Sequence, residues 1–150
     1  MKTNAFLTHR AKTLPEYEED TGKWVEGFYV ILTDCDQHKT HHRIYPGYTE
    51  SDCGELYPDS YAVDEKTVSI NTGIKDKNGK QIYTGDIVKY DGRRIHEVVF
   101  EDSFGNAEFG ISFPERGEVW GFGHYVPGNI LEIIGNVWDN PDLAEEARDV

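Results

Sequence analysis

Two turn dipeptides, Asn-Gly at 78–79 and Asp-Gly at 91–92, constrain the fold of this chain more than any other sequence feature. Both residues of such a pair tolerate a positive φ, so the pair closes a tight hairpin where alternating strand patterns flank it. The second dipeptide lies between DIVKY (86–90) and RRIHEVVF (93–100), two short runs rich in β-branched and apolar residues. We therefore predict a two-residue turn and a pair of antiparallel strands here.

The next segments extend this hairpin into a three-stranded meander. SFGN (103–106) has the composition of a turn, and AEFGISF (107–113) that of a third strand. Alternation within 86–90 places Ile87 and Lys89 on one face and Val88 and Tyr90 on the other.

The remaining elements are short. Further strands are predicted at 23–32, 42–45, 66–70 and 129–139. The first of these is expected to be bent or bulged at Gly27, and the last at Gly135. A C-terminal helix is predicted over 140–150, and Asn140 can cap it. The rest of 33–60 is polar and rich in Asp, His, Pro and Gly, so we expect loops there.

A meander followed by a returning strand predicts a mainly β chain. We expect a small, strongly bent SH3-like barrel, because closing the sheet removes its exposed edges. To this we add an N-terminal β extension and the short C-terminal helix. The chain is expected to be a single domain over 1–150, with a β and loop subregion at 1–65 and a barrel-like subregion at 66–150.

The charge of the chain argues against nucleic-acid binding. Fifteen Lys and Arg against 28 Asp and Glu give 15 − 28 = −13, and no basic cluster is visible. Such a chain repels DNA and anionic membranes. No run approaches the ~20 apolar residues of a membrane span, and the N-terminus lacks the apolar core of a signal peptide. We therefore expect a cytoplasmic protein whose two cysteines are reduced.

Several segments together resemble a known family. TGIKDKNGKQIYTGDIVKY (72–90) closely resembles the signature segment of the YopX-like proteins of bacteriophages and prophages. GKWVEGFYV (22–30), EKTVSINTG (65–73) and LEIIGNVWDNPDL (131–143) are similar to its N-terminal strand, the lead-in to its signature and its C-terminal ending. The resemblance implies a small phage-encoded, mainly β protein. No activity is generally assigned to the family, so it supplies no catalytic residues.

The chain departs from the family pattern in two places. FLTHRAK (6–12) stands where a Phe-Arg-Gly-Lys-like opening is more typical, and the His-containing region at 34–60 is longer. These differences concern the N-terminal edge and one loop region, and leave the predicted barrel unaffected.

A group of thiols and imidazoles in this longer region is the best metal candidate. Its members are Cys35, His38, His41, His42 and Cys53. Zinc binds such ligands tetrahedrally, and His38, His41 and one or both cysteines would be the ligands. However, the paired Cys-x₂-Cys spacing of a zinc knuckle is missing. We therefore predict no metal and no cofactor, and keep a metal-dependent enzyme centred on 35–53 as an alternative.

No catalytic motif surrounds the candidate nucleophiles. Cys53, Ser60 and Ser103 lack a recognisable activating base. His96 is predicted to lie within a strand, where it packs or faces solvent. His124 lies among glycines and aromatics, a better place for binding, but no acid is paired with it by spacing. We predict that the protein is not an enzyme.

The segment VWGFGHY (119–125) is the best candidate for a partner surface. Trp120, Phe122 and Tyr125 either close the open end of the barrel or contact a ligand. We expect a phage or prophage accessory protein that binds a host or phage protein or assembles with itself. The other alternative is an acidic decoy that occupies a host DNA-binding protein. We expect no direct binding to nucleic acid or membranes.

Overall fold

The computed structural model describes residues 8–15, 21–103, 106–122 and 125–149. The described chain is mainly β, with two antiparallel sheets and one short C-terminal helix, in agreement with the predicted class. It divides into two compact units, residues 1–70 and 71–150. This division lies five residues after the subregion boundary predicted from the sequence, and the single YopX-like domain stays a prediction.

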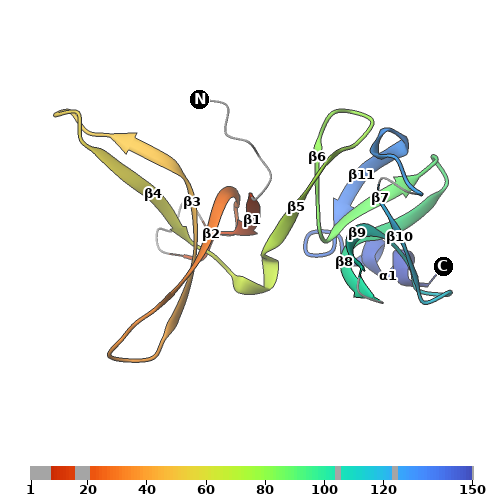
Figure 1. The fold of residues 1–150 in the computed structure, drawn as a ribbon, viewed down its shortest axis with the longest axis horizontal. Coiled ribbons are helices and arrows are strands. Elements are labelled where there is room, and N and C mark those ends of the chain that lie inside the picture. Colours follow the sequence, from red (N-terminus) through yellow and green to blue (C-terminus); the bar gives the residue numbers. More distant parts are fainter. Residues whose placement is uncertain (1–7, 16–20, 104–105, 123–124, 150) are drawn as a thin grey trace. The chain divides into compact units, whose positions relative to one another are not determined.

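The first unit is an antiparallel sheet in the order β4-β3-β2-β1, with the first residues of β5 beside β1. Its elements are β1 (His9–Lys12), β2 (Trp24–Thr33), β3 (Thr40–Glu50), β4 (Leu56–Ala62), the 3₁₀ turn η2 (Glu65–Thr67) and the start of β5 (Ser69–Lys75). Figure 1 shows β3 shared by two long hairpins whose loops lie at opposite ends of the strand.

The small core of this unit lies where β1, β3 and the segment after β4 meet. Ala11, Ile44 and Val63 are almost completely buried there. The predicted irregularity at Gly27 is not a bulge, because β2 keeps its register with β1 up to Gly27 and with β3 from Phe28 onward. A Cβ on this glycine would lie 2.4 Å from the carbonyl oxygen of Tyr45. The glycine therefore permits close approach of two strands.

The prediction of loops with one short strand over 33–60 is wrong. Residues 40–50 and 56–62 form the long strands β3 and β4, and a register shift between Ile44 and Gly47 interrupts their pairing. No residue of β4 is fully buried. A strand exposed on both faces lacks apolar alternation, so its backbone pairing leaves little trace in the sequence.

The second unit contains a five-stranded antiparallel sheet in the order β10-β9-β8-β7-β11. Its elements are β6 (Gln81–Tyr83), β7 (Asp86–Tyr90), β8 (Arg94–Ser103), β9 (Asn106–Phe113), β10 (Glu118–Gly121), the 3₁₀ turn η3 (Gly128–Ile130), β11 (Leu131–Asn136) and α1 (Pro141–Arg148). The predicted meander is confirmed as β7, β8 and β9. The sequence missed β10, which lies in the segment expected to be a loop.

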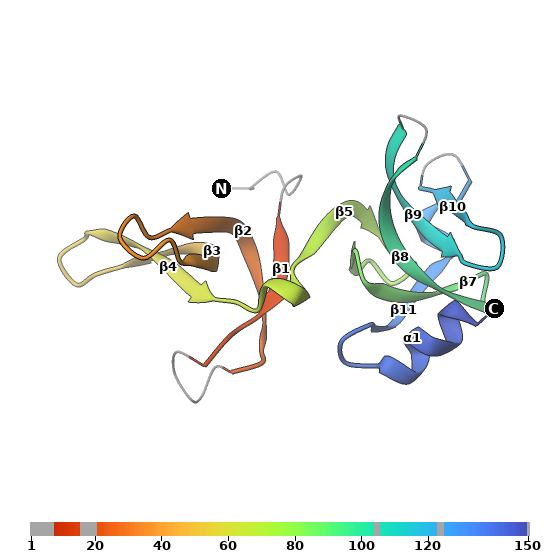
Figure 2. The same ribbon diagram turned by 90° about the horizontal axis from the view of Figure 1, so that it is seen from below.

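The alternation correctly places Ile87 and Val88 on opposite faces of β7, and the structure buries both faces against different partners. Val88 belongs to the larger core of the unit, together with Ile111 and Leu131. Ile87 packs against Ala144 on α1. Figure 2 shows α1 alongside β7 and β11. The helix therefore covers the face of the sheet opposite the larger core.

The predicted irregularity at Gly135 is present, whereas the predicted side-chain cap of the helix by Asn140 is not formed. The register of β11 with β7 shifts between Ile133 and Gly135, which confirms an irregularity there. Asn140 occupies the N-cap position of α1, but its side chain accepts no hydrogen bond from the helix. Instead its Oδ1 accepts from the Asn136 N–H at 3.1 Å. The amide thus joins the end of β11 to the start of α1.

A closed barrel is not formed by the described residues. Strands β10 and β11 lie at the two edges of an open sheet and do not pair with each other. After β10 the described residues show an isolated parallel bridge between Phe122 and Val126. Short local pairings fix the meander, whereas closure requires two strands far apart in the sequence to meet.

The two turn dipeptides differ in conformation. At Asp91 and Gly92 both φ values are positive, 47° and 67°, as expected for a tight hairpin. The prediction of a two-residue turn is nevertheless wrong: Tyr90 pairs with Arg94, so the loop has three residues and includes Arg93. In the other dipeptide only Gly79 has a positive φ, 81°.

The Asn-Gly turn is held by a buried carboxylate. Oδ1 of Asp76 accepts from the backbone N–H groups of Asn78 and Lys80, both at 2.9 Å. Oδ2 accepts from the N–H of Ile133 on β11 at 3.2 Å. Burial raises the pKa of Asp76, but these donors outweigh burial and leave the pKa below its ordinary value. This turn therefore has a structural role.

Candidate functional site

Three aromatic side chains from separate strands meet in the second unit. Tyr90 ends β7, Phe113 ends β9 and Trp120 lies on β10. The ring centroids of Phe113 and Trp120 are 4.4 Å apart, and the rings of Tyr90 and Trp120 meet edge-on at 6.5 Å. Such tilted and edge-on contacts are favourable for aromatic pairs. Packing therefore holds Trp120 in place.

These rings line a cavity of about 180 Å³, which we call the aromatic pocket. Its lining residues are Tyr90, Asp91, Arg93, Arg94, Phe113 and Trp120. Trp120 also borders a depression of about 360 Å³, the outer depression, lined by Glu118, Val119, Trp120 and Tyr125. Trp120 thus lines two hollows.

Arginines surround the aromatic pocket. The guanidinium of Arg116 lies 5.8 Å from the ring centroids of both Phe113 and Trp120, within the range of cation–π attraction. The side chains of Arg93 and Arg94 are exposed and make no ion pair with any described residue. The pocket therefore combines aromatic walls with unpaired positive charge.

His96 lies beneath the aromatic pocket and is 1% exposed. Its ring centroid is 4.3 Å from that of Phe113, and its Nδ1–H donates to the carbonyl oxygen of Ser112 at 2.9 Å. Its Nε2 is buried without a hydrogen-bond partner among the described residues. Burial lowers the pKa of His96, and the Arg94 guanidinium lowers it further, against the opposing effects of Ser112 and Glu115. The imidazole is therefore neutral at pH 7.

The predicted aromatic segment divides between packing and exposure. Trp120 and Phe122 pack against the larger core, whereas Tyr125 is 70% exposed. His124 lies outside the described residues. Sequence analysis missed Tyr90 and Phe113 as members of this site, because only the pairing of the sheet brings them to Trp120.

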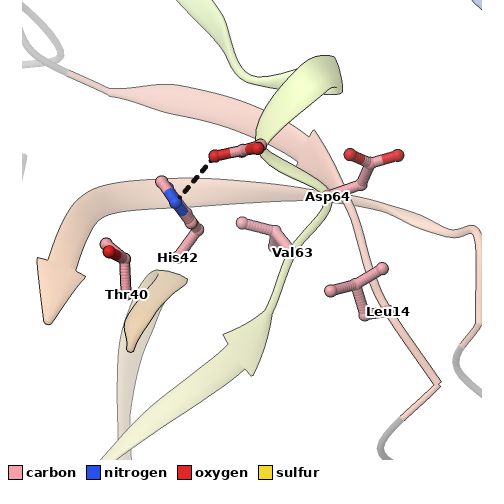
Figure 3. Close-up of a pocket in the computed structure, with 6 residues that line it drawn as sticks. Leu14, Thr40, His42, Val63 and Asp64 are labelled. Atoms are coloured by element: carbon pink, nitrogen blue, oxygen red, sulfur yellow. Dashed lines mark ion pairs between the residues drawn. The ribbon is translucent and has the colours of Figure 1, made fainter. Parts of the chain in front are cut away.

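A second pocket lies in the first unit, around His42. This histidine pocket is an open hollow of about 490 Å³ lined by Leu14, Thr40, His42, Val63, Asp64 and Glu65. In Figure 3, His42 lies between Thr40 and Val63, and its ion pair to Glu65 is drawn as a dashed line. The hollow is polar and has no aromatic wall.

Both nitrogens of His42 are already engaged. Nδ1 is hydrogen-bonded to the hydroxyl of Tyr29, and Nε2 lies 2.9 Å from Oε2 of Glu65. Burial and the Glu65 carboxylate raise the pKa of Tyr29, which keeps the phenol protonated. This network links β2, β3 and η2, and presents neither a free imidazole nitrogen nor a phenolate. Its geometry fits a structural role.

The structure disperses the candidate metal ligands. Cys35 precedes β3 and Cys53 follows it, and eleven strand residues separate their loops by roughly 30 Å. His41 and His42 are neighbours on β3, so their side chains point to opposite faces. His38 lies in the same loop as Cys35, with a φ of 52°. No group of three or more His, Cys, Asp and Glu among the described residues is placed to hold a metal ion.

The candidate nucleophiles are also separated from any base. Cys53 is exposed, and hydrogen bonds from the Ser51 hydroxyl and from the Glu55 backbone lower the pKa of its thiol. The Ser60 hydroxyl accepts from the Arg43 guanidinium at 3.0 and 3.1 Å. The side chain of Ser103 lies outside the described residues. No histidine is hydrogen-bonded to Cys53 or Ser60 in the described structure.

The chain is similar to one protein family and to a solved structure. A family model described as "YopX protein" matches residues 12–145. The crystal structure of protein EF1440 from Enterococcus faecalis is similar over 91% of this chain and 96% of that chain, with 25% identity and a TM-score of 0.56. No curated protein matches the chain. None of the helices that the structure describes is long and apolar enough to cross a membrane.

Proposed function

The chain belongs to the YopX protein family, and from this premise we propose that it is a phage or prophage accessory protein that binds another protein through the surface around Trp120. The resemblance of segment 72–90 supports the proposed phage origin. The geometry of the site supports the proposed mode of action. We place the protein in the bacterial cytoplasm and assign it no enzymatic activity.

The observation that carries this proposal is that Trp120 lines two hollows. The aromatic pocket and the outer depression measure about 180 and 360 Å³. Pockets for whole small molecules measure about 300–1,000 Å³ and bury most of the ligand. The aromatic pocket is smaller than this range, the outer depression lies near its lower end, and both are open, so they are better suited to single side chains of a protein partner. Exposed Tyr125 beside them adds a residue type enriched in binding hot spots.

The chain order supports an SH3-like relationship for residues 71–150. Strands β7 to β10 follow one another as a meander, η3 comes next, and β11 returns to pair with β7. We propose that this unit is a variant of the SH3-like fold with an open sheet. SH3-like units bind extended peptide segments in aromatic grooves, which agrees with the proposed use of Trp120.

A pull-down with matched tyrosine variants tests the proposal. Tyr125 and Tyr48 are both 70% exposed, but only Tyr125 borders the outer depression. Tagged wild-type protein and Tyr48→Ala are expected to capture the same stoichiometric partner from nuclease-treated host or phage-infected lysate. Tyr125→Ala is expected to lose most of it. Equal capture by both variants, or capture of no partner, would contradict the proposal.

The acidic decoy remains a second candidate because of the net charge of −13. A decoy contacts its target through carboxylates, so binding falls steeply as salt rises and does not depend on Tyr125. The same pull-down, washed at increasing salt, separates the two functions. A basic DNA-binding partner lost with salt, and equally from both tyrosine variants, would favour the decoy.

A further inference from the structure

We propose that the occupant of the aromatic pocket is an acidic protein segment, whose carboxylates bind Arg93 and Arg94 while an apolar side chain contacts Phe113 and Trp120. This inference rests on the proposed protein-binding function and specifies the chemistry of the partner.

The first argument is charge complementarity. The whole chain has 15 basic against 28 acidic residues, yet three arginines, Arg93, Arg94 and Arg116, gather around this one pocket. The acidic residues near them are Asp91, Glu115, which lies 3.7 Å from Arg116, and Glu118, which accepts from the Trp120 Nε1–H at 3.3 Å. The charged residues that line the pocket itself are two arginines and Asp91, so this lining is positive on an acidic protein. An acidic segment is the complementary partner for such a patch.

The second argument is the availability of the arginines. Within the described structure, the guanidinium groups of Arg93 and Arg94 have no carboxylate partner, and both residues are exposed. A guanidinium offers five N–H donors in a planar fork that matches a carboxylate. Binding a partner's carboxylate therefore requires no internal ion pair to be broken at these two residues.

The third argument is the aromatic wall. Arg116 stacks near the faces of Phe113 and Trp120, and a stacked guanidinium keeps its edge donors free. The rings below are held by the tilted contact between Phe113 and Trp120. A partner side chain that enters the pocket meets apolar surface at its base and cationic groups at its rim. Such a pocket selects an apolar residue flanked by Asp or Glu.

The net charge of the protein does not oppose this recognition at short range. At physiological salt, interactions between exposed charges are largely screened beyond about 8 Å. A carboxylate in contact with Arg93 or Arg94 therefore interacts mainly with these groups. Distant carboxylates chiefly slow the approach of an acidic partner.

Selection from a library of random peptides displayed on a carrier tests the inference. The full-length protein is used as bait, and enriched peptides are then synthesised and titrated. The test variant is the double substitution Arg93→Gln with Arg94→Gln. The control is Lys39→Gln with Lys75→Gln, which removes the same charge from exposed residues that do not line the pocket.

Enriched peptides are expected to contain Asp or Glu beside an apolar residue. They are expected to bind the arginine variant at least about tenfold more weakly, as loss of charge-assisted hydrogen bonds implies, and the lysine variant with little change. Equal weakening of both variants would show general charge attraction and overturn the inference. Peptides without acidic residues, or no enrichment, would also overturn it. The proposed function would survive either result if Tyr125→Ala still lost the captured partner.

Discussion

Replacement of Asp76 by Asn is predicted to destabilise the second unit strongly, although the two side chains have nearly the same shape. Asp76 is 6% exposed, and its carboxylate accepts three backbone N–H groups. An Asn that retains the Oδ1 bonds places an NH₂ group where Oδ2 accepts from Ile133. The substitution therefore loses one charge-assisted bond, sets two donors against each other and weakens the bonds to Asn78 and Lys80.

The magnitude follows from these contacts. A hydrogen bond to a charged group contributes about 1.5–3 kcal/mol, and a buried donor left unsatisfied costs about 1–3 kcal/mol. Asn78 and Lys80 are exposed, so water can satisfy their N–H groups in part. The half-buried N–H of Ile133 has less access to water. We expect the Asn variant to lose about 2–3 kcal/mol of unfolding free energy.

Urea unfolding followed by circular dichroism and tryptophan fluorescence measures the loss. With an m value of about 1–3 kcal/mol/M, the midpoint is expected to fall by about 1–2 M. Asp52→Asn provides the control, because Asp52 is exposed in the β3–β4 loop. A shift no larger for Asp76→Asn than for Asp52→Asn would refute the assigned role of Asp76.

The pH dependence gives an independent check on the same carboxylate. The folded-state pKa of Asp76 is lower than in the unfolded chain. Its stabilising contribution is therefore fully present above about pH 4 and is lost as the pH falls through the folded pKa. The stability of Asp76→Asn is expected to fall less steeply with acid than that of the wild type.

Two further substitutions have definite expected outcomes. The pKa of buried His96 is lowered, so its contribution to stability is complete above about pH 6.5 and declines as the pH falls from there towards the folded pKa. His96→Gln is expected to flatten this decline when unfolding by urea is measured at a series of pH values. The substitution His38→Gln, at an exposed residue, is not expected to flatten it. Gly85 has a φ of +80°, and a Cβ there would lie 2.3 Å from the Trp138 ring, whereas Gly92, with a φ of +67°, has open space. In thermal or urea unfolding, Gly85→Ala is expected to cost about 2–4 kcal/mol and Gly92→Ala about 1–2 kcal/mol, and equal losses would contradict the steric account.

The elements that could be predicted from the sequence are those whose pattern lies within a few neighbouring residues. Residues 86–90 carry alternation and a following turn dipeptide, and both features appear in the structure as β7 and its hairpin. The strands at 40–50 and 56–62 carry neither, because much of their surface faces solvent on both sides. Their pairing depends on backbone hydrogen bonds, to which most side chains contribute little information.

The site was predictable only in part for a related reason. Trp120 and Tyr125 stand out as aromatics in a glycine-rich segment, so they were identified as a candidate partner surface. Tyr90 and Phe113 read as ordinary strand residues, and only the register of the sheet places them beside Trp120. Arg93 and Arg94 likewise belong to the strand predicted at 93–100, the partner of residues 86–90 in the hairpin. Their importance depends on their lack of ion pairs, which a sequence does not reveal.

The dispersal of the candidate metal ligands has the same origin. Cys35 and Cys53 are close enough in sequence to suggest one site, provided that the intervening residues form a compact loop. The intervening segment instead contains the extended strand β3, which separates them. The spacing of ligands predicts a metal site only when the structure between the ligands is known.

Amide hydrogen exchange of the protein bound to its captured partner tests the central claim most directly. Our account predicts slower exchange on binding in β10 and in the turn at 90–94, the segments that border the aromatic pocket. Little change is expected in β3 and β4, where Tyr48 and other exposed apolar residues offer a competing surface. Protection confined to β3 and β4, with β10 and 90–94 unchanged, would contradict the assignment of the aromatic pocket as the binding site.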